Sequence, residues 1–323
     1  MEERKYIYLI NYPKEESALC SLELKSLFSE EINLKNKLFI SNIYYNLSVS
    51  PFLKEGIDVL FQEDSLEEII NKLVSTPIKA KDYKVIYLKT YDKTIPYNER
   101  LDSVKRIGEL IDGRFNIHNP KEVFAITFVD NRWYFGRYLK NDFDWHIHER
   151  KPNNYSNSIN IRTARALVNI AIKDNRSLTL VDPCCGVGTV IIEALSMGID
   201  VHGYDINKSI VSKARRNLEF FGYERQIIEY CDINNLEKKY DVAIIDLPYN
   251  LFTPITRDEQ ISIITSSYKI CNRLILLTFE DMENDVLKAG FKIVDKCTIP
   301  KGKFIRRLLV CEKERRTLHE SYK

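Results

Sequence analysis

The sequence predicts the α/β fold class, with a doubly wound sheet in the second half and a smaller α/β region before it. Strand-like and helix-like runs alternate regularly over residues 161–298, which is typical of a mostly parallel sheet covered by helices. The last two strand-like runs, 291–298 and 303–311, are separated by too few residues for a helical crossover. We therefore expect them to pair as a terminal antiparallel hairpin.

Each element of the second half has its own signal. The expected strands are short apolar runs, and they cover 178–182, 201–205, 226–232, 240–246, 273–279, 291–298 and 303–311. The expected helices cover 161–173, begin at Thr189 and Lys208, and cover 259–268 and 281–289. Open sheets of this kind bind ligands beyond the carboxyl ends of their strands, where the strand order reverses.

The first half also alternates strand-like and helix-like runs and is expected to be an α/β region of its own. Leucines at helical spacing predict a helix over 15–28. A second helical run at 98–111 is expected to end at Gly113, because glycine is common just after helices. The runs 123–129 and 132–138 are separated by two residues and predict a β-hairpin.

The length of 323 residues is sufficient for two domains, each with its own core. Residues 145–160 contain histidines, asparagines and a proline without sustained periodicity, which is typical of a connecting segment. The expected organisation is therefore an N-terminal domain at 1–144, a linker at 145–160 and the doubly wound domain at 161–323.

The composition is that of an ordinary globular protein, with 44% apolar residues, 29% charged residues and a net charge of +2. The charge gives no global sign of nucleic-acid binding, although a local basic face stays open. Seven cysteines without a CxxC pair indicate reduced thiols. The start does not resemble a signal peptide, and no apolar run approaches the ~20 residues that cross a bilayer. These features predict a cytoplasmic protein that does not engage a membrane.

A glycine turn follows the first strand of the doubly wound domain. Its residues are Asp182, Pro183, Cys184, Cys185, Gly186, Val187, Gly188 and Thr189. Gly186 and Gly188 allow a sharp turn and bring backbone N–H groups close to a ligand. A purely structural turn is the alternative. Cys184 and Cys185 lack further donors at ligand spacing, and zinc needs four, so we expect inert thiols and no metal.

Acidic side chains end three consecutive strands: Asp182, Asp205 and Asp232. Asp205 lies 23 residues after Asp182, close to the spacing of an acid that accepts from ribose hydroxyls. Asp232 is expected near an adenine edge, with Ile206 and Ile233 as apolar walls. The dinucleotide pattern Gly-x-Gly-x-x-Gly is absent, and a carboxylate beside the turn disfavours a pyrophosphate. The same carboxylate favours the sulfonium and ammonium groups of S-adenosyl-L-methionine, which is the predicted cofactor.

A second motif, Asp246-Leu247-Pro248-Tyr249, ends the fourth strand, 64 residues after Asp182. An exocyclic amine on a nucleobase is a poor nucleophile, because its lone pair is delocalised into the ring. The Asp246 carboxylate and the Pro248 carbonyl can accept its two N–H groups, while Tyr249 offers a stacking face worth ~1–3 kcal/mol. Orientation supplies most of the acceleration in such a site. The motif predicts an amino-methyltransferase with Asp246, Pro248 and Tyr249 as its catalytic residues.

Together the two motifs resemble the signatures of class I S-adenosylmethionine-dependent amino-methyltransferases, Asp-Pro-x-Cys-Gly-x-Gly-Thr and Asp/Asn-Pro-Pro-Tyr. This resemblance implies a Rossmann-like sheet, in which the terminal hairpin distinguishes methyltransferases from dehydrogenases. More narrowly, the chain is similar to the THUMP-associated tRNA guanine-N2 methyltransferases that act at position ten. Residues 22–27, 106–113 and 151–169 resemble that family's early helix, the end of its THUMP domain and the helix before its cofactor loop.

The family resemblance implies a role for each motif residue. The cofactor-binding residues would be Asp182, Pro183, Cys184, Gly186, Gly188, Thr189, Asp205, Ile206, Asp232 and Ile233. Asp246, Pro248 and Tyr249 would hold the guanine. Leu247 and Asn250 depart from the family pattern, which has a proline and commonly a glycine there, and this leaves the choice of base open.

By the same resemblance, residues 1–144 form a ferredoxin-like and THUMP-like domain that binds tRNA, and no protein partner is required. Arg106, Arg132 and Arg137 are the candidate phosphate contacts. A solvated charged helix and a tryptophan in the core, Trp133, explain the same residues without RNA.

Other functions stay open. The enzyme could methylate a guanine of ribosomal RNA, or adenine or cytosine in DNA. DNA enzymes usually need a separate recognition region, and the 23 residues between Tyr249 and Arg273 are too few to form one. A binding subunit that keeps the cofactor fold without catalysis is the alternative from another class, but it would not need the intact acceptor motif.

Overall fold

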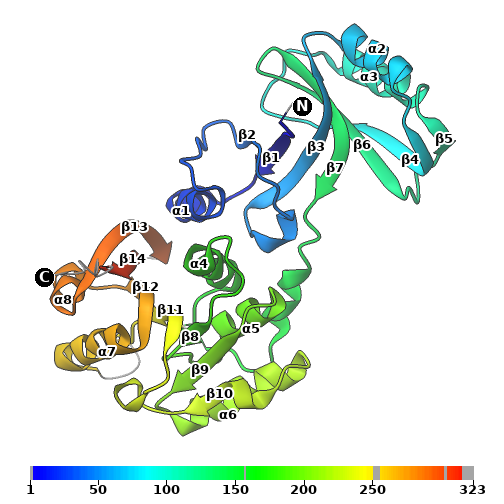
Figure 1. The fold of residues 1–323 in the computed structure, drawn as a ribbon. Coiled ribbons are helices and arrows are strands. Elements are labelled where there is room, and N and C mark those ends of the chain that lie inside the picture. Colours follow the sequence, from blue (N-terminus) through cyan, green and yellow to red (C-terminus); the bar gives the residue numbers. More distant parts are fainter. Residues whose placement is uncertain (1–2, 156–157, 250–254, 302–303, 315–323) are drawn as a thin grey trace, which may run out of the picture. The chain divides into compact units, whose positions relative to one another are not determined.

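The computed structural model divides into two compact units, each built around its own sheet (Figure 1). The residues that the structure describes are 3–155, 158–249, 255–301 and 304–314. The first unit comprises Met1–Tyr12, Ile32–Ser48 and Phe52–Asp142, and the second comprises Pro13–Glu31, Val49–Pro51 and Phe143–Lys323. The chain thus passes between the units several times before residue 143.

The first unit is an α/β fold with the strand order β2-β1-β3-β7-β6-β4-β5. Its elements are β1 (Tyr6–Ile10), β2 (Leu38–Ser41), β3 (Leu53–Glu63), α2 (Leu66–Ser75), β4 (Lys79–Tyr87), α3 (Tyr97–Gly108), β5 (Asp112–Phe115), β6 (Glu122–Val129) and β7 (Arg132–Lys140). The stacked rings of Phe124 and Phe135 share a core with Trp133, Ile69 of α2 and Ile107 of α3. The α/β character expected of this region is confirmed, and its THUMP-like and ferredoxin-like description stays a prediction.

Two local expectations in the first unit have different outcomes. The hairpin of β6 and β7 is confirmed, and Asp130 and Asn131 adopt φ angles of 51° and 61°, as its tight turn requires. The helix expected over 98–111 ends earlier, at Gly108, and Gly113 lies in β5. A Cβ at Gly113 would come within 1.7 Å of the Ala80 carbonyl oxygen. This glycine therefore permits close strand pairing and does not end a helix.

The second unit contains the predicted doubly wound sheet, with the strand order β10-β9-β8-β11-β12-β14-β13. Its strands are β8 (Leu180–Asp182), β9 (Val201–Asp205), β10 (Ile228–Tyr230), β11 (Tyr240–Asp246), β12 (Cys271–Thr278), β13 (Phe291–Lys301) and β14 (Phe304–Lys313). The strands from β10 to β12 are parallel, whereas β14 is antiparallel to both β12 and β13. The Rossmann-like sheet with a terminal hairpin is confirmed.

Helices and short turns complete the second unit. The helices are α1 (Ser17–Phe28), α4 (Ile161–Ile172), α5 (Thr189–Ser196), α6 (Lys208–Phe220), α7 (Arg257–Ile270) and α8 (Glu283–Lys288). The 3-10 turns of the chain are η1 (Lys14–Glu16), η2 (Leu47–Val49), η3 (Asp144–Arg150), η4 (Arg225–Ile227) and η5 (Ile233–Asn235). Within the described parts of the chain, we find no helix with the length and hydrophobicity needed to span a membrane.

The boundary expected at residue 144 is wrong for α1, which belongs to the second unit. The buried carboxylate of Glu23 on α1 accepts hydrogen bonds from Asn169 of α4, at 2.5 Å, and from Ser50, at 2.7 Å. Lys25 forms an ion pair with Asp295 of β13 at 2.8 Å. Sequence periodicity identifies the apolar face of a helix but not the unit that covers it.

The described part of the segment expected to be a linker, 145–160, also packs into the second unit. His148 contacts the buried Glu193 of α5, with 2.6 Å between Nδ1 and Oε1, and Arg165 of α4 donates to the other oxygen of the same carboxylate at 2.9 Å. The Arg165 guanidinium lies over the Trp145 ring, which is 4% exposed. His148 of this segment therefore contacts a buried carboxylate of the second unit, and the segment is not a free linker.

Candidate active site

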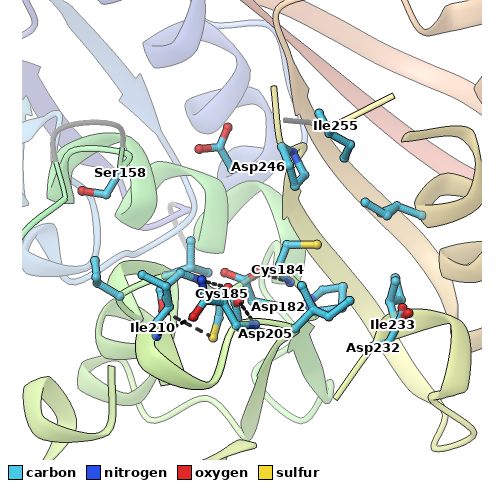
Figure 2. Close-up of a pocket in the computed structure, with 18 of the residues that line it drawn as sticks. Ser158, Asp182, Cys184, Cys185, Asp205, Ile210, Asp232, Ile233, Asp246 and Ile255 are labelled. Carbon is cyan, nitrogen blue, oxygen red and sulfur yellow. Dashed lines mark hydrogen bonds between the residues drawn. The ribbon is translucent and has the colours of Figure 1, made fainter. Parts of the chain in front are cut away.

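A pocket of about 500 Å³ opens beyond the carboxyl ends of β8, β9 and β11. The strand order reverses between β8 and β11, so the pocket lies at the switch point where open sheets bind ligands. The predicted site residues that line it are Asp182, Pro183, Cys184, Gly186, Thr189, Asp205, Ile206, Asp232, Ile233, Asp246, Pro248 and Tyr249. In Figure 2 the side chains of Asp182, Cys184, Cys185 and Asp205 gather together, while Asp246 and Asp232 approach from other sides.

The glycine turn is fixed by hydrogen bonds to the neighbouring strand and to α6. Cys185 N–H donates to the Tyr204 carbonyl of β9 at 2.9 Å, and Gly186 N–H donates to the Asp205 carboxylate at 3.0 Å. The buried amide of Asn217 on α6 donates to the Val187 carbonyl at 2.9 Å. Gly186 has a φ of 53°, which other residues rarely adopt. The turn therefore has one defined shape.

Gly188, the second glycine of the turn, contacts α6 and β10. Gly188 is not among the described residues that line the pocket. A Cβ at this position would approach the side chains of Ile228 at 3.2 Å and Leu218 at 3.4 Å. Its φ of 81° starts α5. Gly188 is therefore required for helix packing, whereas Gly186 is the glycine that borders the pocket.

Asp182 is buried, with 4% of its surface exposed, and accepts a hydrogen bond from Cys184 N–H at 3.2 Å. Burial raises the pKa of Asp182 well above its usual value, and the charges of Asp246 and Asp205 raise it further. Burial and the Asp182 charge also raise the pKa values of the Cys184 and Cys185 thiols. Both thiols therefore stay protonated, as expected of inert cysteines.

The two oxygens of Asp205 accept from Gly186 N–H at 3.0 Å and from Asn207 N–H at 2.8 Å. A carboxylate has about four acceptor sites, so capacity remains for ligand hydroxyl groups. Asp232 similarly accepts from Asn234 N–H at 2.9 Å. These bonds hold both acids in place at the ends of β9 and β10 without using all of their acceptor sites.

The pocket has the character that a cationic, hydroxyl-bearing ligand requires. Four aspartates line it, together with Glu259, and its described lining includes neither lysine nor arginine. Such a surface disfavours phosphate groups and favours positive charge. Ile206 and Ile233 add apolar surface. The residues therefore fit S-adenosyl-L-methionine better than a dinucleotide.

The predicted amine pocket is part of the same cavity. Asp246 at the end of β11 forms an ion pair with Arg306 of β14, with 3.3 Å between nitrogen and oxygen. The Pro248 carbonyl accepts a hydrogen bond from Gln260 of α7 at 2.9 Å. Tyr249 lines the cavity and contacts the Phe279 ring, with 4.3 Å between centroids. The structure thus brings Asp246, Pro248 and Tyr249 together at one cavity with the glycine turn.

Leu247 replaces the proline of the family pattern and has a structural role that proline could not fill. Its N–H donates to the Leu277 carbonyl of β12 at 2.8 Å, and its side chain is buried. Proline has no N–H group to donate. The substitution therefore adds a hydrogen bond beside the acceptor motif. Asn250, the other departure, lies outside the described residues.

Several residues of the site were missed by the sequence reasoning. Asn207, the N-cap of α6, lines the pocket, and an Asx residue between a strand and a helix was an available signal. Tyr155 and Ile159 line it from the segment assigned to a linker. Gln260 and Arg306 have no local signal, because they reach the motif only through the fold.

The candidate RNA contacts of the first unit have acidic partners in two of three cases. Arg106 forms an ion pair with Glu67 at 2.6 Å, and Arg132 forms one with Asp64 at 3.3 Å. Arg137 is exposed. Trp133 is a core residue, as in the reading without RNA. Among the described residues, no group of three or more His, Cys, Asp or Glu side chains could hold a metal ion.

Comparison with known proteins finds a family match for part of the second unit. Residues 148–259 match the family described as RMKL-like, methyltransferase domain. Three archaeal proteins named tRNA (guanine(10)-N2)-dimethyltransferase also match. The one from Pyrococcus abyssi is 27% identical over 214 residues, which cover 60% of this chain and 64% of that protein. The match thus spans less than two thirds of that relative's length.

Two further matches have other names. The type II methyltransferase M.VspI from Vibrio sp. (strain 343) is 29% identical over 133 residues, which cover 38% of this chain and 33% of that protein. The crystal structure of TrmN from Thermus thermophilus is 16% identical, covers 96% of this chain and 99% of its own, and has a TM-score of 0.48.

The Rossmann-like sheet and the match of residues 148–259 together indicate a class I methyltransferase domain in the second unit. The matches to the archaeal proteins confirm the resemblance to the tRNA guanine-N2 methyltransferases that the sequence motifs indicated.

Proposed function

We propose that this protein transfers a methyl group from S-adenosyl-L-methionine to the exocyclic N2 amine of a guanine in tRNA. One observation carries the proposal: the glycine turn and the Asp246-Leu247-Pro248-Tyr249 motif border a single cavity. A methyl donor and an amine held in that cavity would be neighbours, and proximity of this kind is a large part of catalysis.

The cofactor side of the cavity is assigned by its acceptors. Asp205 would accept from ribose hydroxyls, and Asp232 with Ile206 and Ile233 would hold the adenine. Asp182 would favour the positive charge of the ligand, because that charge compensates the carboxylate in its buried position. When bound, S-adenosyl-L-methionine supplies an activated methyl group.

The amine side is assigned by its two acceptors and its ring. The Asp246 carboxylate and the Pro248 carbonyl would each accept one N–H of the amine. The nitrogen lone pair would then be less delocalised into the ring and could point toward the methyl group of the cofactor. A carbonyl oxygen has two acceptor sites, so the Pro248 carbonyl can hold both Gln260 and the amine. Tyr249 would stack on the base, which must leave its helix to reach the cavity.

Transfer RNA is the proposed partner because three of the relatives that match are named tRNA (guanine(10)-N2)-dimethyltransferase. The first unit would hold the RNA, and the exposed Arg137 is its best candidate contact, since Arg106 and Arg132 are engaged by acids. A tRNA substrate would fit the cytoplasmic location that cysteine usage indicated.

DNA is the second candidate substrate, because the chain also matches a type II methyltransferase. A separate recognition region between β11 and β12 would favour DNA. α7 already occupies 257–270 of that interval, and β12 begins at Cys271. This leaves no room for such a region there and favours RNA.

Methyl transfer from tritiated S-adenosyl-L-methionine tests the proposal. The acceptors are unmodified tRNA transcripts, ribosomal RNA and duplex DNA, and the control is the Asp246→Ala variant. We expect label on tRNA, recovered as N2-methylguanosine by nucleoside mass spectrometry, and none with the variant. Label found only on ribosomal RNA or DNA would contradict tRNA as the substrate. Cofactor binding without any transfer would indicate a non-catalytic binding subunit.

A further inference from the structure

We propose that Arg306 is a positioning residue of the methyl-transfer site, which holds the Asp246 carboxylate in the orientation that accepts the target amine. The inference rests on the proposed function and adds a residue that neither motif contains. Arg306 lies 60 positions after Asp246 in the chain. It reaches the site because β14 pairs with β12, which in turn pairs with β11.

The geometry couples Arg306 to the acceptor. Its guanidinium lies 3.3 Å from the Asp246 carboxylate, and the side chains are 3% and 20% exposed. Asp246 borders the cavity, whereas Arg306 is outside its described lining. Arg306 therefore contacts the carboxylate from the side of the protein, while Asp246 itself borders the cavity.

Arg306 also supports the aromatic part of the site. Its guanidinium lies 5.1 Å from the centroid of the Phe279 ring, and Phe279 in turn contacts Tyr249 at 4.3 Å between centroids. One buried cation thus contacts the amine acceptor directly and the stacking ring through a single intermediate.

The charge of the cavity explains why a cation is needed at this place. Four aspartates line it, and the Asp246 charge is close enough to Asp182 to act on that group. Repulsion between the acids would turn Asp246 away from its neighbours. A guanidinium behind Asp246 opposes this repulsion.

The test measures single-turnover methyl transfer by the full-length Arg306→Met and Arg306→Lys variants, together with S-adenosyl-L-methionine affinity by calorimetry. Because a misplaced acceptor typically costs about 10²-fold in rate, we expect that loss in Arg306→Met with unchanged cofactor affinity. Arg306→Lys should recover part of the rate, since lysine keeps the charge but not the planar fork.

Arg273→Met is the matched control for general damage to the sheet. Arg273 is partly buried and pairs with Glu312 of β14, but it lies outside the described lining of the cavity. This variant should lower the unfolding midpoint while the folded enzyme keeps its transfer rate. Equal rate losses in Arg273→Met and Arg306→Met would overturn the proposal.

A double-mutant cycle with Asp246→Asn separates positioning from an independent role. If Arg306 acts through Asp246, adding Arg306→Met to Asp246→Asn should change the rate little, so the two effects will not add. Fully additive effects would contradict the inference while the proposed function stands. Absence of transfer by the wild type onto tRNA, ribosomal RNA and DNA would overturn both.

Discussion

Gln260 and Pro248 are joined by a partly buried hydrogen bond in which the Gln260 side-chain amide donates to the Pro248 carbonyl at 2.9 Å. Gln260 is 2% exposed and lies in the first turn of α7, while Pro248 follows β11. The carbonyl is one of the two acceptors proposed for the target amine. Its direction is therefore set by a helix outside the acceptor motif.

Replacing Gln260 by Met should reduce the rate of methyl transfer without lowering the affinity for the cofactor. The substitution removes the donor, so the carbonyl is no longer held, and we expect a rate loss of about tenfold, equivalent to ~1.4 kcal/mol. Single-turnover kinetics and calorimetry with S-adenosyl-L-methionine measure the two quantities.

Thr256→Ala is the control for this variant, because Thr256 caps the same helix without contacting Pro248. Loss of the cap should cost about 1 kcal/mol of stability and leave the transfer rate unchanged. A rate loss in Thr256→Ala as large as that in Gln260→Met would show that helix stability, and not the carbonyl, is responsible.

Cofactor affinity should increase with pH because of Asp182. Burial raises the pKa of Asp182 well above its ordinary 3.8, so the group is partly protonated in the free protein over a range above that value. Only the carboxylate attracts a cationic ligand, so binding should strengthen as pH rises through this range and release a proton. Calorimetry from about pH 5 to about pH 7, below the titration of amino groups, measures the trend.

Asp182→Asn supplies the comparison for that titration. This variant cannot ionise at position 182, so its affinity should be lower and nearly independent of pH. If its affinity follows the wild-type pH profile, another carboxylate controls binding.

The two glycines of the turn should respond differently to alanine. A Cβ at Gly186 meets no atom within 4 Å, whereas at Gly188 it would approach Ile228 at 3.2 Å. Both residues have positive φ, so each substitution should cost about 1 kcal/mol or more in backbone strain. Gly188→Ala should add a packing penalty and be the less stable variant, while Gly186→Ala should lose more cofactor affinity. Urea unfolding and calorimetry would contradict this assignment if the order were reversed.

Protein stability should fall as pH rises toward neutrality because of Glu23. Burial raises the pKa of Glu23 from 4.5 to about 7, although hydrogen bonds from Ser50 and Asn169 lower it in part. A raised folded-state pKa stabilises the protein below the unfolded value, and this contribution is lost as pH rises through about 7. The slope is at most ~1.4 kcal/mol per pH unit for one proton.

Glu23→Gln should remove this slope, because glutamine is neutral at every pH and can still bond Ser50 and Asn169. Urea unfolding at several pH values between about 4.5 and about 7.5 measures it. Identical slopes in the wild type and the variant would assign the pH dependence to another group.

Local signals explain what the sequence predicted well. β9 and β11 have the predicted bounds, since each is an apolar run that ends in an aspartate. The cavity followed from those ends, because parallel strands of one sheet finish at a common edge. Site residues such as Asp205 and Asp246 could therefore be predicted from their spacing in the sequence alone.

Long-range contacts explain what the sequence did not predict. Arg306 and Asp246 meet only after β14 has paired with β12, and no spacing rule connects them. Gly113 was assigned to a helix end because a glycine after a helix and a glycine in a closely paired strand look alike in the sequence. The assignment of α1 failed for a similar reason, since Glu23 is buried by partners far along the chain.

The placement of α1 means that the methyltransferase half cannot be obtained by cutting the gene once. The second unit includes residues 13–31 and 49–51 as well as the chain from residue 143 onward. A fragment that starts at 143 would leave Asn169 without the Glu23 carboxylate and would uncover the side of α4 that α1 packs against. During synthesis, this core can be completed only after β13 and β14 have been made, because α1 packs against β13.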